Sequence, residues 1–240
     1  MIVLNMGIPR SGTVWAFNVL RLIFDEHEVA FTPANANSPD EIDAALSAHD
    51  PAGHLIAHFH DITPAVEQAA QDPDSHVFFN YRDPRDVVCS QMKLHDADFD
   101  IACDMTANAF KLFDNVLAMP RVMLLPYPHV VNHPEALIYQ MGLSMGFLLD
   151  LETVARIAAE TSREKHRQVV AEMPKDDEDA VLRSFSGKRW VSMDKTHLLN
   201  DRHIQSGATG RWLEELTPDQ QDRVNQVFAH PIRVLGFGAT

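Results

Sequence analysis

The sequence predicts an α/β fold, a three-layer sandwich in which helices cover both faces of a central parallel β-sheet. Three observations lead to this prediction. Short apolar runs alternate with longer amphipathic stretches, two of these stretches open with helix-capping residues, and a glycine-rich turn joins the first apolar run to the first helical stretch. In sheets of this type, ligands bind at the carboxyl ends of the strands.

Four apolar runs have the length of buried strands. They are "IVLNM" (2–6), "HLIAHF" (54–59), "HVFFNY" (76–81) and "RVMLLPY" (121–127). Each is almost continuously apolar instead of alternating, which indicates a strand buried on both faces, as in a parallel sheet.

Helices are predicted between and after these strands. Ser38 is a helix N-cap with Pro39 at the first helical position, and helical patterns follow in "TPAVEQAAQ" (63–71) and in the long segment 84–118.

The C-terminal part of the chain is predicted to be mainly helical from about 133 to 183. Residues 172–193, "EMPKDDEDAVLRSFSGKRWVSM", are expected to be an irregular excursion bordering a binding cleft. A last helix is expected to begin after Thr217, with Pro218 at its first position.

Composition limits the possible functions. The chain of 240 residues is expected to form a single domain over 1–240, and its 34 acidic and 20 basic residues give a net charge of −14. This charge argues against nucleic acid or an anionic membrane as partner, so an anion site must be local. The first 24 residues have the features of neither a signal peptide nor a membrane span, which predicts a cytoplasmic protein. Cys89 and Cys103 are expected to be reduced thiols.

The glycine loop, "GIPRSGTVW" (7–15), has the spacing of a phosphate-binding turn. Ser11, Gly12 and Thr13 are expected to present amides and hydroxyls at the positive end of the following helix. A nucleoside-triphosphate loop would end in Gly-Lys-Ser/Thr, whereas here the cation is Arg10. The alternative is a glycine turn that merely ends a strand.

The glycine loop resembles the 5′-phosphosulfate loop of sulfotransferases that use 3′-phosphoadenylyl sulfate (PAPS), whose pattern is Pro-Lys/Arg-Ser/Thr-Gly-Thr-Thr-Trp. Six residues fit this pattern: Pro9, Arg10, Ser11, Gly12, Thr13 and Trp15. Val14 replaces a hydroxyl. The resemblance implies a P-loop NTPase-like sulfotransferase fold, with PAPS bound along residues 10–15 and Trp15 against the adenine.

A second segment, "YRDPRDVVCS" (81–90), resembles the family's 3′-phosphate segment, in which an arginine and a serine eight residues later bind the 3′-phosphate. Arg82 and Ser90 have that spacing. Arginine suits a phosphate because its guanidinium donates a fork of charged hydrogen bonds. The alternative is an arginine that only pairs with Asp83 or Asp86.

The family's catalytic histidine lies between these two segments, in Lys-Thr-His. The resemblance assigns that role to His60 in "HLIAHFHD" and places His58 where the family has lysine. Histidine supplies a cation there only when it is protonated. "KTHL" also occurs at 195–198, so Lys195 and His197 are the competing pair, although they follow both phosphate segments.

Two alternatives to catalysis concern the same histidines. His54, His58, His60 and Asp61 resemble part of a zinc motif, but Asp61 adjoins His60 directly and no further histidine follows. A buried structural histidine is the other alternative. No metal site is predicted.

Two further matches complete the resemblance. Tyr127 resembles the tyrosine that approaches the adenine. "IQSGATGRWLEELT" (204–217) resembles the late loop Arg-Lys-Gly-x-x-Gly-x-Trp, in which Gln205 and Ser206 replace the two cations. Gly207 is expected to contribute its amide, and Arg202 or Arg211 to supply the missing charge.

These features predict a PAPS-dependent sulfotransferase that acts on the hydroxyl of a small molecule. Arg10 is expected to neutralise charge on the bridging oxygen, and His60 to act as general base. PAPS is the only co-substrate expected, without metal. The alternatives are a P-loop small-molecule kinase or nucleotidase, and a nucleotide-binding module without catalysis.

Overall fold

The computed structural model spans residues 1–240 and describes all of them except 174–180, 187–188, 195, 201–206 and 239–240. The chain forms two compact units. The sheet unit consists of Met1–Tyr81 and Leu112–Lys165, and the helical unit consists of Arg82–Lys111 and His166–Thr240.

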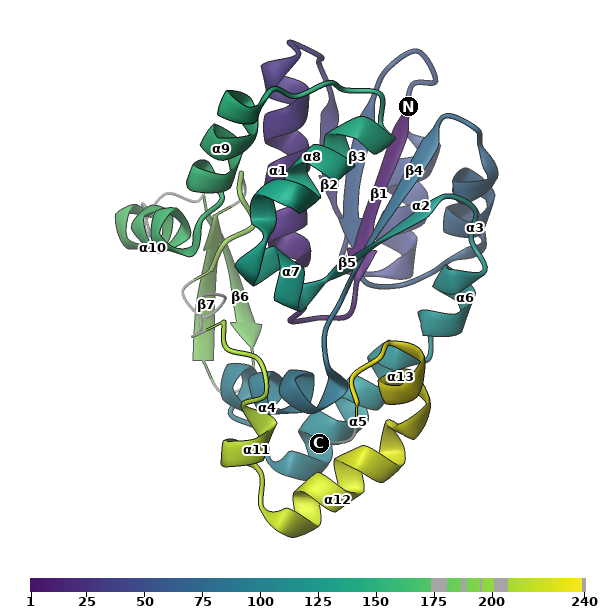
Figure 1. Ribbon diagram of the computed structural model, residues 1–240. Coiled ribbons are helices and arrows are strands. Elements are labelled where there is room, and N and C mark those ends of the chain that lie inside the picture. The colour runs from purple at the N-terminus through teal and green to yellow at the C-terminus, as the bar shows by residue number, and fades with distance from the viewer. Residues whose placement is uncertain (174–180, 187–188, 195, 201–206, 239–240) are drawn as a thin grey trace. The chain divides into compact units, whose positions relative to one another are not determined.

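The sheet unit contains a five-stranded sheet in the order β2-β3-β1-β4-β5 (Figure 1). Every neighbouring pair of strands is parallel. The strands are β1 (Ile2–Gly7), β2 (Thr32–Asn35), β3 (Leu55–Phe59), β4 (Ser75–Tyr81) and β5 (Val122–Pro126). Because β1 lies between β3 and β4, its carboxyl end is flanked by theirs.

Helices cover both faces of this sheet, as right-handed crossovers between parallel strands require. The helices of the sheet unit are α1 (Thr13–Glu26), α2 (Pro39–Ser47), α3 (Pro64–Gln71), α6 (Phe113–Leu117), α7 (Tyr127–Asn132), α8 (Pro134–Ser144) and α9 (Leu151–Glu160). Helix α1 packs with α8 and α9, whereas α2 packs with α3 on the other face (Figure 1). The predicted three-layer α/β sandwich is therefore confirmed.

The core of the sheet unit includes several large phenylalanine side chains. Phe17 and Phe24 on α1, Phe59 on β3 and Phe78 on β4 are all buried. Each fully buried side chain of this size contributes about 1.5–3 kcal/mol relative to an exposed one, so α1 is held firmly against the sheet.

The helical unit contains α4 (Pro84–His95), α5 (Phe99–Phe110), α11 (Trp212–Glu215), α12 (Pro218–Val227) and α13 (Ala229–Val234). It also holds an antiparallel hairpin of β6 (Val181–Ser186) and β7 (Arg189–Asp194). Helix α10 (Arg163–Glu172) begins in the sheet unit and ends in the helical unit.

Buried Arg85 joins the start of α4 to the end of the chain. Its guanidinium lies 4.1 Å from the centre of the Trp212 ring, and its nitrogens donate to Asp83, to Asn225 and to the Phe237 carbonyl. The C-terminal residues are thereby tied to the helix that follows Arg82.

The predicted strands lie within about one residue of the observed ones, and the capping box at Thr217 confirms the helix predicted to begin there, although α13 follows it. Two features differ from the expectations. The edge strand β2 was missed, and residues 172–193 include the hairpin strands instead of being irregular throughout. The segment 84–118 is helical as predicted, and it divides into three helices because Asp96 adopts a left-handed backbone (φ 51°) and Asp98 caps a new helix.

No helix in the described part of the chain is both long enough and apolar enough to cross a membrane.

Candidate functional site

The glycine loop closes over the carboxyl end of β4. The Ile8 amide donates to the Asn80 carbonyl (2.9 Å), and the Ser11 hydroxyl donates to the same carbonyl (2.9 Å) and contacts the Ile8 carbonyl. This buried hydroxyl holds the loop to the sheet, and the contact of Ser11 with a phosphate stays a prediction.

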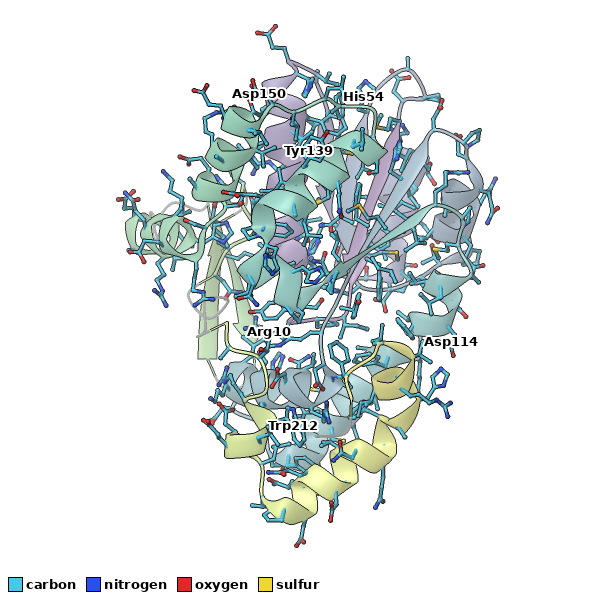
Figure 2. All side chains as sticks on the ribbon, in the orientation of Figure 1. Arg10, His54, Asp114, Tyr139, Asp150 and Trp212 are labelled. Atoms are coloured by element: carbon cyan, nitrogen blue, oxygen red, sulfur yellow. The ribbon has the colours of Figure 1, made fainter. Side chains whose placement is uncertain are left out.

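The turn of the loop requires left-handed backbone at two positions, Arg10 (φ 70°) and Gly12 (φ 94°). Left-handed backbone is easy for glycine and costs energy for arginine. Arg10 lies in the loop between β1 and α1, and its side chain is partly exposed (Figure 2). A non-glycine residue keeps this unfavourable backbone conformation only where the surrounding loop enforces it.

The N-terminus of α1 is open to an anion. Among the described residues, no side chain caps this helix and no acidic residue lies in its first turn. The first-turn amides of Thr13, Val14 and Trp15 have no carbonyl acceptor within the helix, and they lie at the positive end of its dipole. The geometry therefore fits a phosphate or sulfate group. Trp15 is largely buried, with 8% of its surface exposed.

Gly7 is required by packing. A Cβ atom at this position would lie 2.4 Å from the Asn80 carbonyl oxygen, so only glycine lets β1 approach β4 this closely. At Gly12 a Cβ would lie 3.6 Å from the Tyr127 ring and 3.7 Å from the Asn80 side-chain nitrogen. Tyr127, the first residue of α7, is therefore next to the glycine loop, and β5 ends one residue before it.

His60 follows β3 directly, and its ring is hydrogen-bonded to the loop. Its Nδ1 lies 2.8 Å from the Gly7 carbonyl oxygen. Because a carbonyl only accepts, Nδ1 carries the proton and Nε2 is left as the acceptor. Burial lowers the pKa of His60, although the Gly7 hydrogen bond and Asp61 partly oppose this shift. A neutral imidazole with a basic Nε2 is the form that a general base needs.

His58, which lies on β3 two residues before His60, is buried with 5% of its surface exposed. The Asn5 amide nitrogen donates both to the Thr13 carbonyl (3.0 Å) and to His58 Nδ1 (3.0 Å). Since Nδ1 accepts, the proton of His58 is on Nε2 and the ring is neutral. This hydrogen bond favours a neutral positioning role over the cationic role expected from the family lysine.

Two residues that the sequence analysis did not single out complete this cluster, Asn5 on β1 and Asn80 on β4. Both are fully buried. Asn5 pairs in register with His58, and Gly7 pairs with Asn80, so these residues share the face of the sheet toward α1. The signal for them was an asparagine near the end of each otherwise apolar strand, "IVLNM" and "HVFFNY".

In the helical unit, Arg82 lies two residues before the start of α4 and Ser90 lies on that helix. Both residues are buried. Arg82 donates to the Ala208 carbonyl (2.8 Å) and forms an ion pair with Asp86 (3.7 Å). The pairing with Asp86 that the alternative predicted is present, but both side chains are almost fully buried, unlike a surface pair.

The late loop is held to α4 by the same carboxylate. Asp86 accepts the amides of Gly210 (2.8 Å) and Trp212 (3.2 Å). Gly207 and Gly210 have φ values of 70° and 78°, which explains glycine at both positions. The predicted residues Gln205 and Ser206, together with Arg202, lie outside the described residues.

Of the alternative catalytic pair, Lys195 and His197, the structure describes only His197, because Lys195 lies outside the described residues. His197 Nδ1 contacts the Asp194 carboxylate. Burial raises the pKa of Asp194, but hydrogen bonds from His197 and Thr196 outweigh it and leave the pKa lowered. Burial, together with the nearby His197, lowers the pKa of His166 to about 4.

Comparison with solved structures decides the fold. Mouse sulfotransferase SULT7A1 complexed with PAP has a TM-score of 0.68 and 14% identity, with 97% of this chain and 84% of that chain covered. The chain has the sulfotransferase fold. Retinol dehydratase has TM-scores of 0.63, in complex with androsterone and the inactive cofactor PAP, and 0.61, in complex with retinol and PAP. These two matches have 14% and 13% identity, cover 96% of this chain each, and cover 80% and 81% of those chains.

Comparisons at the sequence level found no relative of this chain. No family model matches the chain, and no curated protein sequence matches it. The sulfotransferase fold is therefore shared at a sequence identity that carries no information on substrate.

Within the sulfotransferase fold of this chain, no group of three or more metal-binding side chains occurs among the described residues. His54 precedes β3, and Figure 2 shows it at the opposite end of the sheet from Arg10. It is thus separated from His60 by the length of a strand, which argues against a shared metal site.

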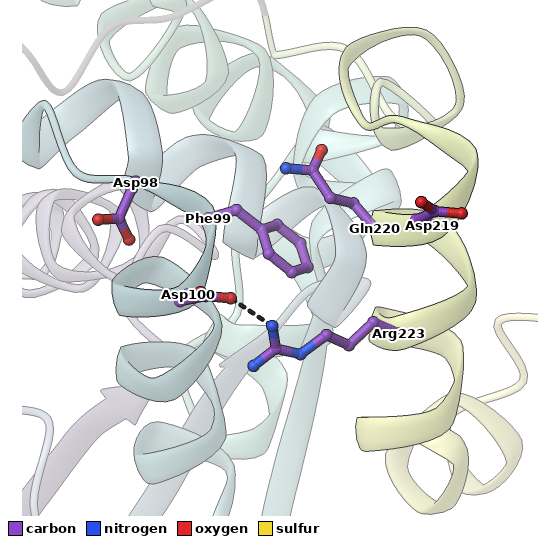
Figure 3. A pocket seen from close by; sticks show the side chains of 6 residues that line it. All are labelled: Asp98, Phe99, Asp100, Asp219, Gln220 and Arg223. Carbon is purple, nitrogen blue, oxygen red and sulfur yellow. Dashed lines mark hydrogen bonds and ion pairs between the residues drawn. The ribbon is translucent and has the colours of Figure 1, made fainter.

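A pocket of about 490 Å³ lies in the helical unit (Figure 3). It is lined by Asp98, Phe99, Asp100, Asp219, Gln220 and Arg223. Arg223 forms an ion pair with Asp100 and lies 5.5 Å from the centre of the Phe99 ring. None of the predicted site residues lines this pocket.

Proposed function

We propose that this chain is a PAPS-dependent sulfotransferase that transfers a sulfuryl group to the hydroxyl of a small molecule, with residues 1–240 acting as one domain. The observation that carries the proposal is the juxtaposition of an open helix N-terminus and a neutral histidine. The Gly7 carbonyl that precedes the glycine loop also holds His60, with Nε2 left as acceptor.

The residues for the donor fall into two groups. In the sheet unit, the amides of Gly12, Thr13 and Val14 suit the 5′-phosphosulfate, with Arg10 as cation and Trp15 and Tyr127 available to the adenine. In the helical unit, Arg82, Ser90 and the Gly207 amide suit the 3′-phosphate. Gln205 and Ser206 remain part of the proposal, although they lie outside the described residues.

The chemistry needs one proton acceptor and one cation. The donor supplies the sulfuryl group, whose sulfur–oxygen bond to the 5′-phosphate breaks as a new bond to the acceptor oxygen forms. His60 Nε2 takes the proton of the acceptor hydroxyl. Arg10 and the amides of α1 stabilise the negative charge left on the phosphate. His58, fixed by Asn5, positions the ring of His60, 5.2 Å away between ring centres.

No metal is required in this scheme. A triphosphate loop needs its lysine and hydroxyl pair to hold phosphate and magnesium. Here Thr13 follows Gly12, and the loop cation is Arg10. In this scheme the guanidinium of Arg10 supplies positive charge in place of magnesium.

A small neutral acceptor fits the composition. The net charge of −14 disfavours polyanionic acceptors such as acidic glycans. Androsterone and retinol, bound in the retinol dehydratase structures, are molecules of this size class.

The experiment combines binding and turnover. Calorimetry without metal should show that adenosine 3′,5′-bisphosphate (PAP) binds far more tightly than AMP. Labelled PAPS should then deliver its label to members of a hydroxyl-acceptor panel. Tight binding of ATP that requires magnesium would indicate a kinase instead, and tight binding of PAP without transfer to any acceptor would indicate a binding module.

A further inference from the structure

We infer that the side-chain amide of Asn80 is part of the anion site: its Nδ2 donates a hydrogen bond to an oxygen of the phosphate or sulfate group bound at the N-terminus of α1. This inference rests on the proposed function and adds a residue to the site. Asn80 lies on β4, outside the glycine loop that the family resemblance covers.

The backbone of Asn80 already has a structural role. Its carbonyl oxygen accepts from the Ile8 amide and the Ser11 hydroxyl, so it holds the glycine loop against the sheet. Any residue at this position would supply that carbonyl. The backbone contacts therefore do not explain why the side chain is an amide.

The side chain is buried and has no internal use. Asn80 is 0% exposed, and within the described part of the chain neither its Nδ2 nor its Oδ1 has a hydrogen-bond partner. The preceding β4 residues, Val77, Phe78 and Phe79, are apolar and buried. An unpaired buried amide is costly, and an apolar residue of similar size would avoid that cost.

Asn5 provides the contrast on the neighbouring strand. Its Nδ2 donates to both the Thr13 carbonyl and His58 Nδ1, so the N–H groups of that amide are used within the folded chain. Its Oδ1, like that of Asn80, has no hydrogen-bond partner among the described residues. The two asparagines face the same side of the sheet, but only Nδ2 of Asn5 has protein acceptors.

The position of the Asn80 amide points to the ligand. Its Nδ2 lies 3.7 Å from where a Cβ of Gly12 would be, and Gly12 is the N-cap residue of α1. The amide is therefore directly beside the turn whose backbone N–H groups form the anion site. A buried, uncharged N–H donor at this point suits an anionic oxygen, because a hydrogen bond to a charged acceptor is stronger than one between neutral groups.

The test compares two nucleotides that differ only at the 5′ end. PAP carries a 5′-phosphate, and adenosine 3′-monophosphate lacks it, so the ratio of their dissociation constants measures the site at α1. We expect Asn80→Leu to lower PAP affinity by about 10-fold and to leave adenosine 3′-monophosphate affinity unchanged. Asn80→Asp should lower PAP affinity further, because a carboxylate repels the anion.

Thermal unfolding without ligand supplies a second readout. Asn80→Leu should melt at the same temperature as the wild type or higher, since it removes an unpaired buried amide. The exposed variant Asn37→Leu is the matched control and should change neither the melting temperature nor the affinity ratio.

The outcomes separate the two proposals. A wild type that binds PAP no better than adenosine 3′-monophosphate would refute the proposed site at α1 itself. A wild type that discriminates strongly, together with Asn80→Leu and Asn80→Asp variants that keep the full ratio, would overturn the role of Asn80 alone. If both variants fold and both lose the preference for PAP over adenosine 3′-monophosphate, the role of Asn80 in the anion site is supported.

Discussion

The ring Nδ1 of His60 lies 2.8 Å from the carbonyl oxygen of Gly7, which joins the candidate base to the first residue of the glycine loop. One hydrogen bond thus sets both the tautomer of the histidine and its position relative to the N-terminus of α1. The same backbone turn that exposes amides to an anion therefore orients Nε2 of the imidazole.

Replacing His60 should separate binding from turnover. We expect His60→Ala to retain PAP affinity within a few-fold and to lower sulfate transfer by about 10² to 10⁴, the usual contribution of a positioned base. Single-turnover transfer from labelled PAPS measures the second quantity. His197→Ala is the matched control, and it should retain most activity. The reverse ranking of the two variants would show that the later histidine is the base.

The pH dependence of transfer should follow the lowered pKa of His60. The base must be neutral to accept a proton, and burial holds its pKa below the ordinary value of about 6.5. The acid limb of kcat/KM for the acceptor should therefore be centred below about pH 6.5, with a plateau at higher pH. An acid limb centred above the ordinary histidine range would contradict a buried, neutral His60. His197→Ala should leave the profile unchanged.

Arg82 should govern the preference for a 3′-phosphate. Arg82→Ala should weaken PAP binding by about 2 kcal/mol, roughly 30-fold, and leave AMP binding almost unchanged. Calorimetry with both nucleotides gives this difference directly. Because the change also deprives buried Asp86 of its ion pair, Arg82→Lys should be measured beside it. Lysine keeps the charge and should retain part of the preference, and equal PAP and AMP affinities in the wild type would defeat the assignment.

Asn5 should matter for stability. Asn5→Ala removes the amide that donates to the Thr13 carbonyl and to His58 Nδ1, so two buried hydrogen bonds are lost. The free energy of unfolding should fall by about 1–3 kcal/mol, measured by urea titration. Asn37→Ala, at an exposed position, should change it by less than about 0.5 kcal/mol. Equal effects of the two substitutions would show that the Asn5 hydrogen bonds contribute little.

The sequence alone predicted the layer architecture, four of the five central strands and the glycine loop between the first strand and the first helix. These features are local, because continuous apolar runs, capping residues such as Ser38 and Thr217, and glycine spacing each act within a few residues. Strand β2 was missed for the same reason. It is short, exposed at its start and contains Pro33, so its only strand signal is its pairing with β3.

Tertiary structure alone decided which polar groups meet at the carboxyl ends of the strands. The Ser11 hydroxyl donates to the Asn80 carbonyl, 69 positions away in the sequence. His58 was expected to be a cation, but its partner is Asn5, 53 positions away in the sequence. The sequence determined the elements because their signals are short-range, whereas strand register brings together residues that no local pattern connects. The tautomers of both histidines and the buried Asn80 amide follow from that register.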